Sequence, residues 1–402
     1  MSKKNEHKPN VPELRFPEFS GEWEEKRLGD YAYIKGRLGW KGLKQEEYVE
    51  NGYAHLIASK HIKNGYIMWS STDQINEFRY KESLEIGLEE NDIIFSKDGS
   101  LGNPAIIKEM PKPATINSTM MLVRLDKELV SPYFFYQILL SNQFQRLIHL
   151  KVSGSSIPHL FQADMKQFQF FSPSLREQKK IGEFFSKIDR QIELEEKKLA
   201  LLEEQKKGYM QKIFSQELRF KDENGNEYPK WKEYEIDRKF NFFDKYRRPI
   251  EASKRIKGIY PYYGATGIID FVDDYIFDGE YILIGEDGAN IISRNSPLVY
   301  ITRGKIWVNN HAHILQPKNG NTYYYYTLLD NVDYSKYNTG TAQPKLNIQT
   351  IKKIKCKFSE NQKEQNKIGR FFEKMDFLIK QSYQKIERLA SRKKVLLQRI
   401  YI

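Results

Sequence analysis

The chain has little cysteine and no long apolar run. Of its 402 residues only Cys356 is a cysteine, which excludes an intrachain disulfide and metal sites built from several cysteines. Low cysteine usage is typical of a reducing cytoplasm, where we expect this protein. No run of about eighteen apolar residues predicts a membrane span. The opening MSKKNEHKPNVP lacks the apolar core of a secretory signal, so we expect residues 1–13 to be a flexible leader.

Motifs of the common catalytic classes are also missing. There is no GxGxxG after a predicted strand, no GxxxxGK followed by Ser or Thr, no HExxH, no paired CxxC and no Asp-Pro-Pro-Tyr methyltransferase signature. Two features come near to a site: the histidines His311 and His313, and the acidic pair Glu286 and Asp287. We interpret the histidines as strand positions and the acids as turn residues. The sequence therefore predicts a chain without catalysis, metal or cofactor of its own.

Positive charge is in surplus. The formal net charge is +12, the pI is about 9.2 and aromatic residues make up 14% of the chain. A basic surplus attracts polyanions, of which nucleic acid is the commonest in cells. The alternative is charge that serves solubility alone. Composition therefore favours DNA or RNA as a partner without establishing it.

The sequence contains one helical segment twice. The stretch from Glu177 to Phe214 returns from Glu364 to Tyr401, without a gap, at a spacing of about 187 residues. Equivalent positions include Phe184 and Phe371, Phe185 and Phe372, Asp189 and Asp376, and Lys206 and Lys393. The chain is therefore organised as globular segment, helix, globular segment, helix.

The two globular segments share shorter matches. SKDG from Ser96 matches GEDG from Gly285, and GSSIPHL from Gly154 matches GTAQPKL from Gly340. INSTMMLV, which contains Thr119 and Met121, matches VNNHAHIL with its two histidines. Short β-branched and aromatic runs between Gly, Asn and Asp turns predict strands, and helical pieces are expected at 133–145 and 323–329. The expected strands are YAHLIAS, DIIFS, TMMLVRL, EYILIGEDG, PLVYI and KIWVNN. We expect α+β segments with a strongly curved sheet.

An apolar stripe follows each helical segment at alternating four- and three-residue steps, as in a coiled coil. It passes through Ile181, Phe185, Ile188, Ile192, Leu199, Leu202, Tyr209 and Ile213, and through Ile368, Phe372, Met375, Ile379, Ile386, Leu389, Leu396 and Ile400. Glu195 and Ser382, and Lys206 and Lys393, interrupt it at equivalent positions, as expected of residues that set register or contact a partner. We predict that the helices pair antiparallel; the alternative is two unrelated surface helices. The predicted interface residues are Phe184, Phe185, Ile188, Ile192, Leu199, Leu202, Phe371, Phe372, Met375, Ile379, Ile386 and Leu389.

Turns rich in Gly, Ser and Thr supply the candidate binding residues. Such turns let a backbone approach a partner closely, and their hydroxyls and amides satisfy phosphate oxygens or base edges. For any one of these residues, ordinary turn chemistry is the alternative. The candidates in the first segment are Ser59, Lys60, His61, Ser96, Lys97, Asp98, Ser100, Ser153, Ser155, Ser156 and His159. Those in the second are Tyr263, Gly264, Ala265, Thr266, Gly267, Glu286, Asp287, Thr339, Thr341, Gln343 and Lys345.

The helix openings LREQKKIGEFFSKID and KEQNKIGRFFEKMD resemble the two repeated regions of the DNA specificity subunit of type I restriction–modification systems. The stretch YPYYGATGIIDFVDDYIFDGEYILIGEDGA resembles the target recognition domains of that family, as does WEEKRLGD. The resemblance covers the chain from Leu14 onward. It implies a pseudo-twofold tandem repeat, with recognition domains at 14–172 and 218–358 and repeated long helices at 173–217 and 359–402.

The resemblance also implies a function. Each recognition domain would bind one half of a bipartite, asymmetric DNA site, and the paired helices would set the unread gap. The helices would also bind two modification subunits, which carry S-adenosylmethionine and adenine methyltransferase chemistry. Restriction subunits that use ATP and Mg would join that complex.

Two other functional classes stay open from the residues. A metal-dependent nuclease would use Glu286, Asp287 and the histidine pair, although the first segment lacks matching residues. A structural adaptor would use the helices to bridge proteins, with the basic charge incidental.

Overall fold

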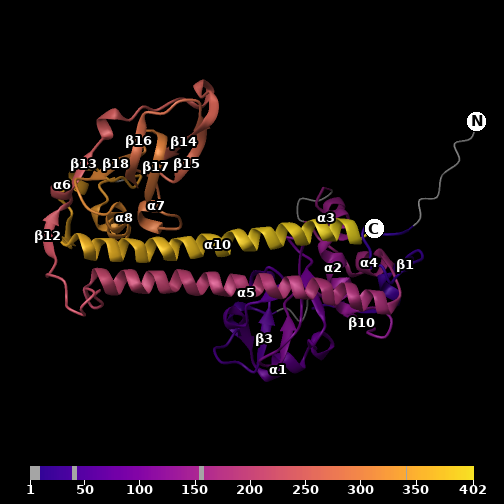
Figure 1. Cartoon of the computed structure of the whole chain (residues 1–402). Coiled ribbons are helices and arrows are strands. Elements are labelled where there is room, and N and C mark those ends of the chain that lie inside the picture. Colours follow the sequence, from indigo (N-terminus) through magenta and orange to yellow (C-terminus); the bar gives the residue numbers. More distant parts are fainter. Residues whose placement is uncertain (1–9, 39–42, 154–157, 341) are drawn as a thin grey trace, which may run out of the picture. The chain divides into compact units, whose positions relative to one another are not determined.

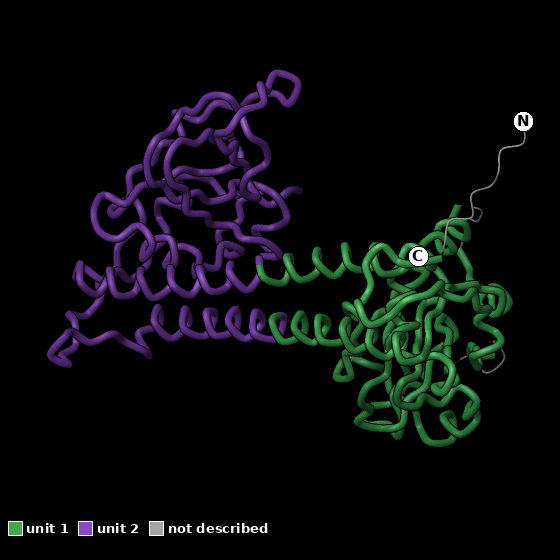
Figure 2. The backbone as a smooth tube through the Cα atoms, turned by 45° about the vertical axis from the view of Figure 1, so that its right-hand side comes forward, with its two compact units in different colours: residues 1–195, 385–402 green, residues 196–384 purple. Residues whose placement is uncertain are grey.

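The chain divides into two compact units, which Figure 2 shows in separate colours. The computed structural model describes residues 10–38, 43–153, 158–340 and 342–402. Unit 1 is residues 1–195 with 385–402, and unit 2 is residues 196–384. Each unit therefore combines one globular segment, the first half of the helix that follows it and the last part of the other long helix. Strands and helices mix in both units, which confirms the predicted α+β class.

The two predicted long helices are α5 (Leu175–Phe214) and α10 (Gln362–Ile400), of 40 and 39 residues. The hydroxyl of Ser174 accepts the Glu177 N–H at 3.4 Å, and the Asn361 side chain accepts the Lys363 N–H at 2.9 Å. Side-chain oxygens at these positions satisfy N–H groups that the first helical turn leaves unpaired. Among the described residues, no helix is both long and apolar enough to cross a membrane.

The described residues of unit 1 form four sheets. A four-stranded antiparallel sheet has the order β2 (Ala32–Gly36), β10 (Met120–Leu125), β7 (Ile93–Ser96), β8 (Gly102–Ile106). A three-stranded sheet has the order β6 (Asp73–Ile75), β3 (Ala54–Ile57), β9 (Ala114–Ile116), and two ribbons pair β1 (Glu24–Arg27) with β11 (Gln169–Ser172) and β4 (Ile62–Lys63) with β5 (Tyr66–Ile67). The short helices are α1 (Glu77–Lys81), α2 (Pro132–Leu140), α3 (Asn142–Ser153) and α4 (Gln162–Gln167), with 3-10 turns η1 (Leu28–Asp30), η3 (Gln45–Glu47), η4 (Ser59–His61), η5 (Trp69–Ser71) and η6 (Leu84–Ile86).

Unit 2 is built on one six-stranded sheet. Its order is β13 (Phe240–Phe242), β18 (Ala312–Pro317), β16 (Phe277–Gly285), β17 (Val299–Val308), β14 (Lys257–Gly264), β15 (Gly267–Val272), and β12 (Lys232–Glu235) pairs separately with β19 (Lys355–Phe358). The short helices are α6 (Ile236–Lys239), α7 (Asn290–Ser293), α8 (Thr322–Asp330) and α9 (Ile348–Lys353), with 3-10 turns η7 (Asp244–Tyr246), η8 (Ala252–Lys254) and η9 (Tyr334–Tyr337). In Figure 1, α8 lies between this sheet and the start of α10.

The sheets of the two units have the same topology with one difference. The order β2-β10-β7-β8 corresponds to β13-β18-β16-β17, and β9-β3-β6 corresponds to the end of β17 followed by β14 and β15. The strand β17 therefore serves both sheets, whereas in unit 1 the segment with Pro111 and Pro113 separates β8 from β9, because proline cannot donate to a ladder. The sequence prediction of separate strands for PLVYI and KIWVNN is wrong: both belong to β17, whose Gly304 has a φ of 77°.

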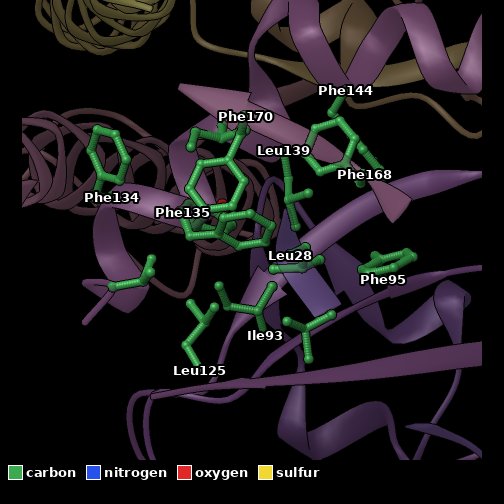
Figure 3. Close-up of a cluster of buried hydrophobic side chains, with 14 of the residues drawn as sticks. Leu28, Ile93, Phe95, Leu125, Phe134, Phe135, Leu139, Phe144, Phe168 and Phe170 are labelled. Atoms are coloured by element: carbon green, nitrogen blue, oxygen red, sulfur yellow. The ribbon is translucent and has the colours of Figure 1, made fainter. Parts of the chain in front are cut away.

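The unit 1 core gathers aromatic side chains around α2. Figure 3 shows Phe135 facing Phe170, with Phe144 beside Phe168, between the helix and the sheet. The ring centroids of Phe135 and Phe170 are 5.2 Å apart at 70°, an edge-to-face arrangement that aromatic quadrupoles favour. This core holds α2 against β11, which carries Phe170.

In unit 1, the core also receives the end of α10. The Tyr401 ring lies 6.2 Å from Trp23, 5.3 Å from Phe134 and 6.0 Å from Phe185 between centroids. Its hydroxyl donates to the Phe134 carbonyl at 3.2 Å. We call Trp23, Phe134 and Phe185 the unit 1 socket.

Unit 2 has the equivalent arrangement at the end of α5. Phe214 lies 6.0 Å from Trp231, 6.3 Å from Tyr324 and 6.1 Å from Phe372. We call these three residues the unit 2 socket. In each unit, the helix that begins there is thus joined by the end of the other long helix.

Ion pairs fix the register of the two helices in each unit. Lys393 Nζ lies 2.6 Å from Asp189 Oδ1 in unit 1, and Lys206 Nζ lies 2.6 Å from Asp376 Oδ1 in unit 2. In unit 1, Lys385 pairs with Glu195 at 2.9 Å. In unit 1, Lys393 follows Lys385 along α10, whereas its partner Asp189 precedes Glu195 along α5. The two helices therefore run antiparallel in that unit, as predicted. The lysines that interrupt the apolar stripe are therefore register-setting residues.

Most of the apolar stripe is buried or half-buried. Phe185, Phe372 and Met375 are buried, and the other predicted interface residues are half-buried: Phe184, Ile188, Ile192, Leu199, Leu202, Phe371, Ile379, Ile386 and Leu389. At the helix ends the expectation needs correction. Near the end of α5, the predicted Tyr209 is 39% exposed, and its neighbour Met210 is buried with 9% exposure. Near the end of α10, Leu397 is buried with 7% exposure, one position after the predicted Leu396. The ends leave the two-helix contact and enter the cores of the units, which changes the buried face.

The described chain before β1, from residue 10 onward, packs on unit 1. The Asn10 carbonyl accepts the Trp23 N–H at 2.8 Å, and residues 1–9 of the expected leader lie outside the described residues. The Leu14 N–H donates to the Arg399 carbonyl at 2.9 Å, the same bond that Leu218 makes to Lys212 in unit 2. Equivalent backbone contacts therefore surround both helix ends.

The socket contacts generate a first prediction. Replacing Tyr401 with Ala removes a fully buried ring, which costs about 3–5 kcal/mol, and the loss should fall on unit 1. Hydrogen exchange followed by mass spectrometry should show faster exchange in α2 and β1 and unchanged exchange in α8. Phe214→Ala is the matched control and should reverse the pattern. Equal loss of protection in both units for either variant would contradict the assignment.

Candidate nucleic-acid interface

In unit 2 the turn that follows β16 lies between two other loops. The Glu286 N–H donates to the His311 carbonyl at 2.8 Å, and the Leu346 N–H donates to the Glu286 carbonyl at 2.7 Å. The Gly288 N–H donates to the Pro344 carbonyl at 3.0 Å, and Asp287 forms an isolated bridge with Lys345. Backbone bonds thus join residues 285–288, the β17–β18 turn and the 338–346 loop at one end of the sheet.

The turn between β14 and β15 reaches the same end. Asn309 N–H donates to the Tyr263 carbonyl at 3.0 Å, and the Tyr300 hydroxyl lies 3.3 Å from the Ala265 carbonyl. A Cβ on Gly285 would lie 2.5 Å from that Ala265 oxygen, so only glycine permits this approach. Thr266 is exposed, while Gly264 and Gly267 are buried. The structure therefore brings together the predicted segments 263–267, 286–287 and 339–345.

The 338–346 loop is closed at its base. Asn338 Oδ1 accepts the Gly340 N–H at 3.0 Å and the Lys345 N–H at 2.8 Å, and the Thr339 N–H donates to the Lys345 carbonyl at 2.8 Å. The side chains of Thr339, Gln343 and Lys345 are exposed. Thr341 lies outside the described residues. The loop presents hydroxyl, amide and ammonium groups from a fixed base.

A charged network lies beneath the loop. Glu286 Oε2 lies 2.6 Å from Arg247 Nη1, and Glu286 Oε1 lies 3.3 Å from Lys345 Nζ. His313 Nδ1 lies 2.5 Å from Asp244 Oδ2 and 3.8 Å from Glu286 Oε2. We call Asp244, Arg247, Glu286, His313 and Lys345 the unit 2 network. It joins η7, the end of β16, β18 and the loop.

Both carboxyl groups of the network are ionised at neutral pH. Burial alone would raise the pKa of Glu286, but the Arg247 hydrogen bond and the His313 charge outweigh it and hold that pKa below its ordinary value. Burial opposes ionisation of Asp244 in the same way, and the His313 hydrogen bond lowers its pKa overall. A lowered folded pKa stabilises the folded state above the ordinary carboxyl pKa, and this contribution is lost as pH falls through the lowered value.

The network is poorly suited to a metal ion. Among the described residues, ligand atoms of Asp244, Glu286 and His313 lie within 4.8 Å of one another. Arg247 and Lys345, however, already neutralise the carboxylates, and two more positive charges beside a divalent cation would repel it. This agrees with the interpretation of His313 as a strand position, because it belongs to β18.

Unit 1 repeats the backbone assembly with other side chains. The Lys97 N–H donates to the Thr119 carbonyl at 2.9 Å, and the Leu160 N–H donates to the Lys97 carbonyl at 2.8 Å. The Gly99 N–H donates to the Pro158 carbonyl at 3.2 Å, and Asp98 bridges His159. Each bond has its counterpart at the equivalent position of unit 2. Lys97 Nζ pairs with Asp98 at 2.8 Å, and the His159 ring also contacts the Asp98 carboxylate.

The remaining unit 1 candidates differ in access. Ser100, Ser153 and Lys60 are exposed, and Ser59 is half-buried. Asn103 Nδ2 lies 3.4 Å from the Ser59 carbonyl, which joins that turn to the start of β8.

Two unit 1 candidates are enclosed by the domain. Ser96 is 1% exposed and His61 is 2% exposed, and His61 Nδ1 accepts the Ala58 N–H at 3.0 Å. Both side chains therefore serve the turn itself in this structure. Ser155 and Ser156 lie outside the described residues.

Sequence reasoning missed the residues that support the loops. Asp244, Arg247 and Asn103 had no motif to mark them, because their partners His313, Glu286 and Ser59 are far away in sequence. Asn338 bonds within its own loop, where no motif marked it either. The run FDKYRR around Arg247 carries concentrated charge between strands, and that charge was the available signal.

The duplicated fold and loop assembly define a protein with two tandem domains of one class. The family described as “Type I restriction modification DNA specificity domain” matches residues 20–204 and 228–388. The chain therefore belongs to this family, which confirms the resemblance inferred from its helix openings.

The similar proteins carry related descriptions. A putative type I restriction enzyme specificity subunit of Haemophilus influenzae is 33% identical over 120 residues, 30% of this chain and 31% of that protein. The type I restriction enzyme MjaVIII specificity subunit of Methanocaldococcus jannaschii is 29% identical over 214 residues, 53% of this chain and 46% of that protein. The chain thus matches less than half the length of these relatives. The type-I restriction-modification system S subunit from M. genitalium is 18% identical with a TM-score of 0.67, covering 98% of this chain and 99% of that one, and shares the fold.

The loop geometry gives a second prediction. A Cβ on Gly340 would lie 1.8 Å from the Gln343 carbonyl oxygen, so Gly340→Ala should change the loop while the sheet stays folded. Hydrogen exchange at the Thr339 and Lys345 amides should accelerate, with little change in the unfolding temperature. Gly208→Ala, whose Cβ meets nothing within 4 Å, is the control and should leave the loop unchanged. An unaltered loop in Gly340→Ala would show that the described conformation is wrong.

Proposed function

We propose that this chain is the DNA specificity subunit of a type I restriction–modification complex, and that each unit recognises one half of a bipartite, asymmetric site. The observation that carries this proposal is the same loop assembly present twice with different side chains. Lys97 in unit 1 corresponds to Glu286 in unit 2, and His159 corresponds to Lys345. Equal backbones with unequal side chains suit two half-sites of different sequence.

The exposed groups of the assembly have the chemistry of DNA recognition. An amide such as Gln343 can bond adenine through both its groups, and Lys345 suits guanine or phosphate. Thr266 and Thr339 offer hydroxyls beside them. In unit 1 we assign the same role to Ser100 and Ser153, which are exposed, and to His159, which is half-buried.

We further propose that α5 and α10 set the number of unread base pairs and bind two modification subunits. At 1.5 Å per residue, a helix of 40 residues spans about 60 Å, more than one DNA turn. Leu194, Leu201, Phe377 and Tyr383 are at least 50% exposed on these helices. Apolar side chains left in solvent along a polar helix are suited to a protein partner.

The chemistry would then reside in the partners. Modification subunits would carry S-adenosylmethionine and methylate adenine, and restriction subunits would use ATP and Mg. The chain itself would contribute recognition and no catalysis. The nuclease alternative is disfavoured because Arg247 and Lys345 occupy the acidic cluster it would need. An adaptor would not require two matching loop assemblies.

A third prediction tests the role directly. Deleting this chain from its cell should abolish adenine methylation at one split, asymmetric motif, measured by sequencing that detects modified bases. The purified complex with modification subunits should bind that motif with affinity that falls steeply with salt, since several phosphates are neutralised. Unchanged genomic methylation together with equal binding to every duplex would contradict the proposal.

A fourth prediction concerns the helices. Four residues added to α5 between Glu195 and Leu202, with four added to α10 between Ser382 and Leu389, lengthen the pair by about 6 Å. The methylated motif should gain base pairs in its gap and keep both half-sites. Four Ala residues added after Glu223, in the 222–226 turn, serve as the control and should leave the gap unchanged. Altered half-sites with the original gap would argue against the spacer role.

A further inference from the structure

We propose that Glu286 and His313 are positioning residues, which hold the 338–346 loop at the end of the unit 2 sheet without touching DNA. The inference rests on the proposed function, because it assigns that loop to recognition. It also revises the sequence prediction, which placed Glu286 among the DNA contacts.

Both oxygens of the Glu286 carboxylate are paired with cations of the unit. Its side chain is 13% exposed, and its two oxygens face Arg247, Lys345 and His313. Its own N–H and carbonyl bind the His311 carbonyl and the Leu346 N–H. A carboxylate that recognises cytosine must offer a free oxygen to the base amine. Glu286 offers its oxygens to cations of the unit instead.

His313 links the strand to the loop. The ring is 1% exposed, with Nδ1 at 2.5 Å from Asp244 Oδ2 and Nε2 at 2.9 Å from the Leu346 carbonyl oxygen. One ring nitrogen thus contacts the ionised carboxylate of Asp244 on η7, and the other contacts the backbone of the loop.

The network presents one cation at the loop. Two carboxylates, Asp244 and Glu286, face the cations Arg247 and Lys345. The side chain of Lys345 is 55% exposed, whereas that of Arg247 is 16% exposed. The ammonium group of Lys345 is therefore presented at the loop, where a phosphate can approach. The network fixes the place of the loop and of this ammonium group.

Unit 1 achieves the same end by other means. Met121 stands where His313 stands in unit 2, and Asp98 contacts both Lys97 and His159 within the turn itself. At the position equivalent to His313, unit 1 therefore carries a methionine in place of a histidine. This difference makes unit 1 an internal reference for any change in the unit 2 network.

The test uses Glu286→Gln in the full chain, assembled with its modification subunits and bound to a duplex library in which each half-site is varied. Affinity should fall about tenfold, the loss expected for one charged hydrogen bond, evenly over all bases of one half-site. The base preferences should not change, and the other half-site should be unaffected. The Leu346 amide should exchange faster, with an unfolding temperature close to that of the original chain. Glu280→Gln, which removes a surface pair with Arg303, is the matched control.

Three results would overturn the proposal. A new base preference at one position would make Glu286 a base contact, and unchanged affinity with unchanged exchange would show that the loop is held without it. Equal losses at both half-sites would mean general destabilisation. If Glu286→Gln folds poorly, His313→Met is used in its place, because it introduces the residue found at the equivalent position of unit 1. This variant must also weaken binding to one half-site only. Absence of specific binding by the original chain would refute the proposed function instead, and the exchange data would still report on the loop.

Discussion

The structure depends on the insertion of one aromatic ring at the end of each long helix into a socket of three aromatic residues. Tyr401 fills the unit 1 socket and Phe214 fills the unit 2 socket. Rings of this size bury a large apolar area. Tyr401 meets Trp23 edge to face, whereas Phe214 stacks on Phe372. Once the rings are seated, the helices must run antiparallel within each unit. The lysine–aspartate pairs then select one register from those that the apolar stripe would allow.

A second layer of order comes from backbone hydrogen bonds at the ends of the sheets. The turn after β7 or β16 takes the same bonds in both units, although its residues are Lys97 and Asp98 in one and Glu286 and Asp287 in the other. Backbone groups are present whatever the side chain, so such a frame survives substitution. Side chains in it can therefore diverge without loss of the loop, which is the property that the proposed reading of two unequal half-sites would require.

The side chains of these turns fall into two groups by their exposure to solvent. Enclosed groups such as Ser96, His61 and Glu286 satisfy the turn or the charged network. Exposed groups such as Gln343 and Thr266 face solvent from a backbone that is already fixed. A fixed backbone reduces the entropy lost when a partner binds. Sequence could not separate the two kinds, because both are polar residues in glycine-rich turns.

The sequence by itself determined the duplication, the two long helices and the segments that carry the loops. These follow from local periodicity and from matches between the halves, which need no tertiary contact to be visible. The tertiary structure alone decided that Tyr401 enters the unit 1 core, that β17 is a single strand, and that His313 lies beneath a loop thirty residues later in the chain. Those features depend on contacts between residues far apart in sequence, where burial, charge pairing and backbone bonding are fixed only when the chain has folded.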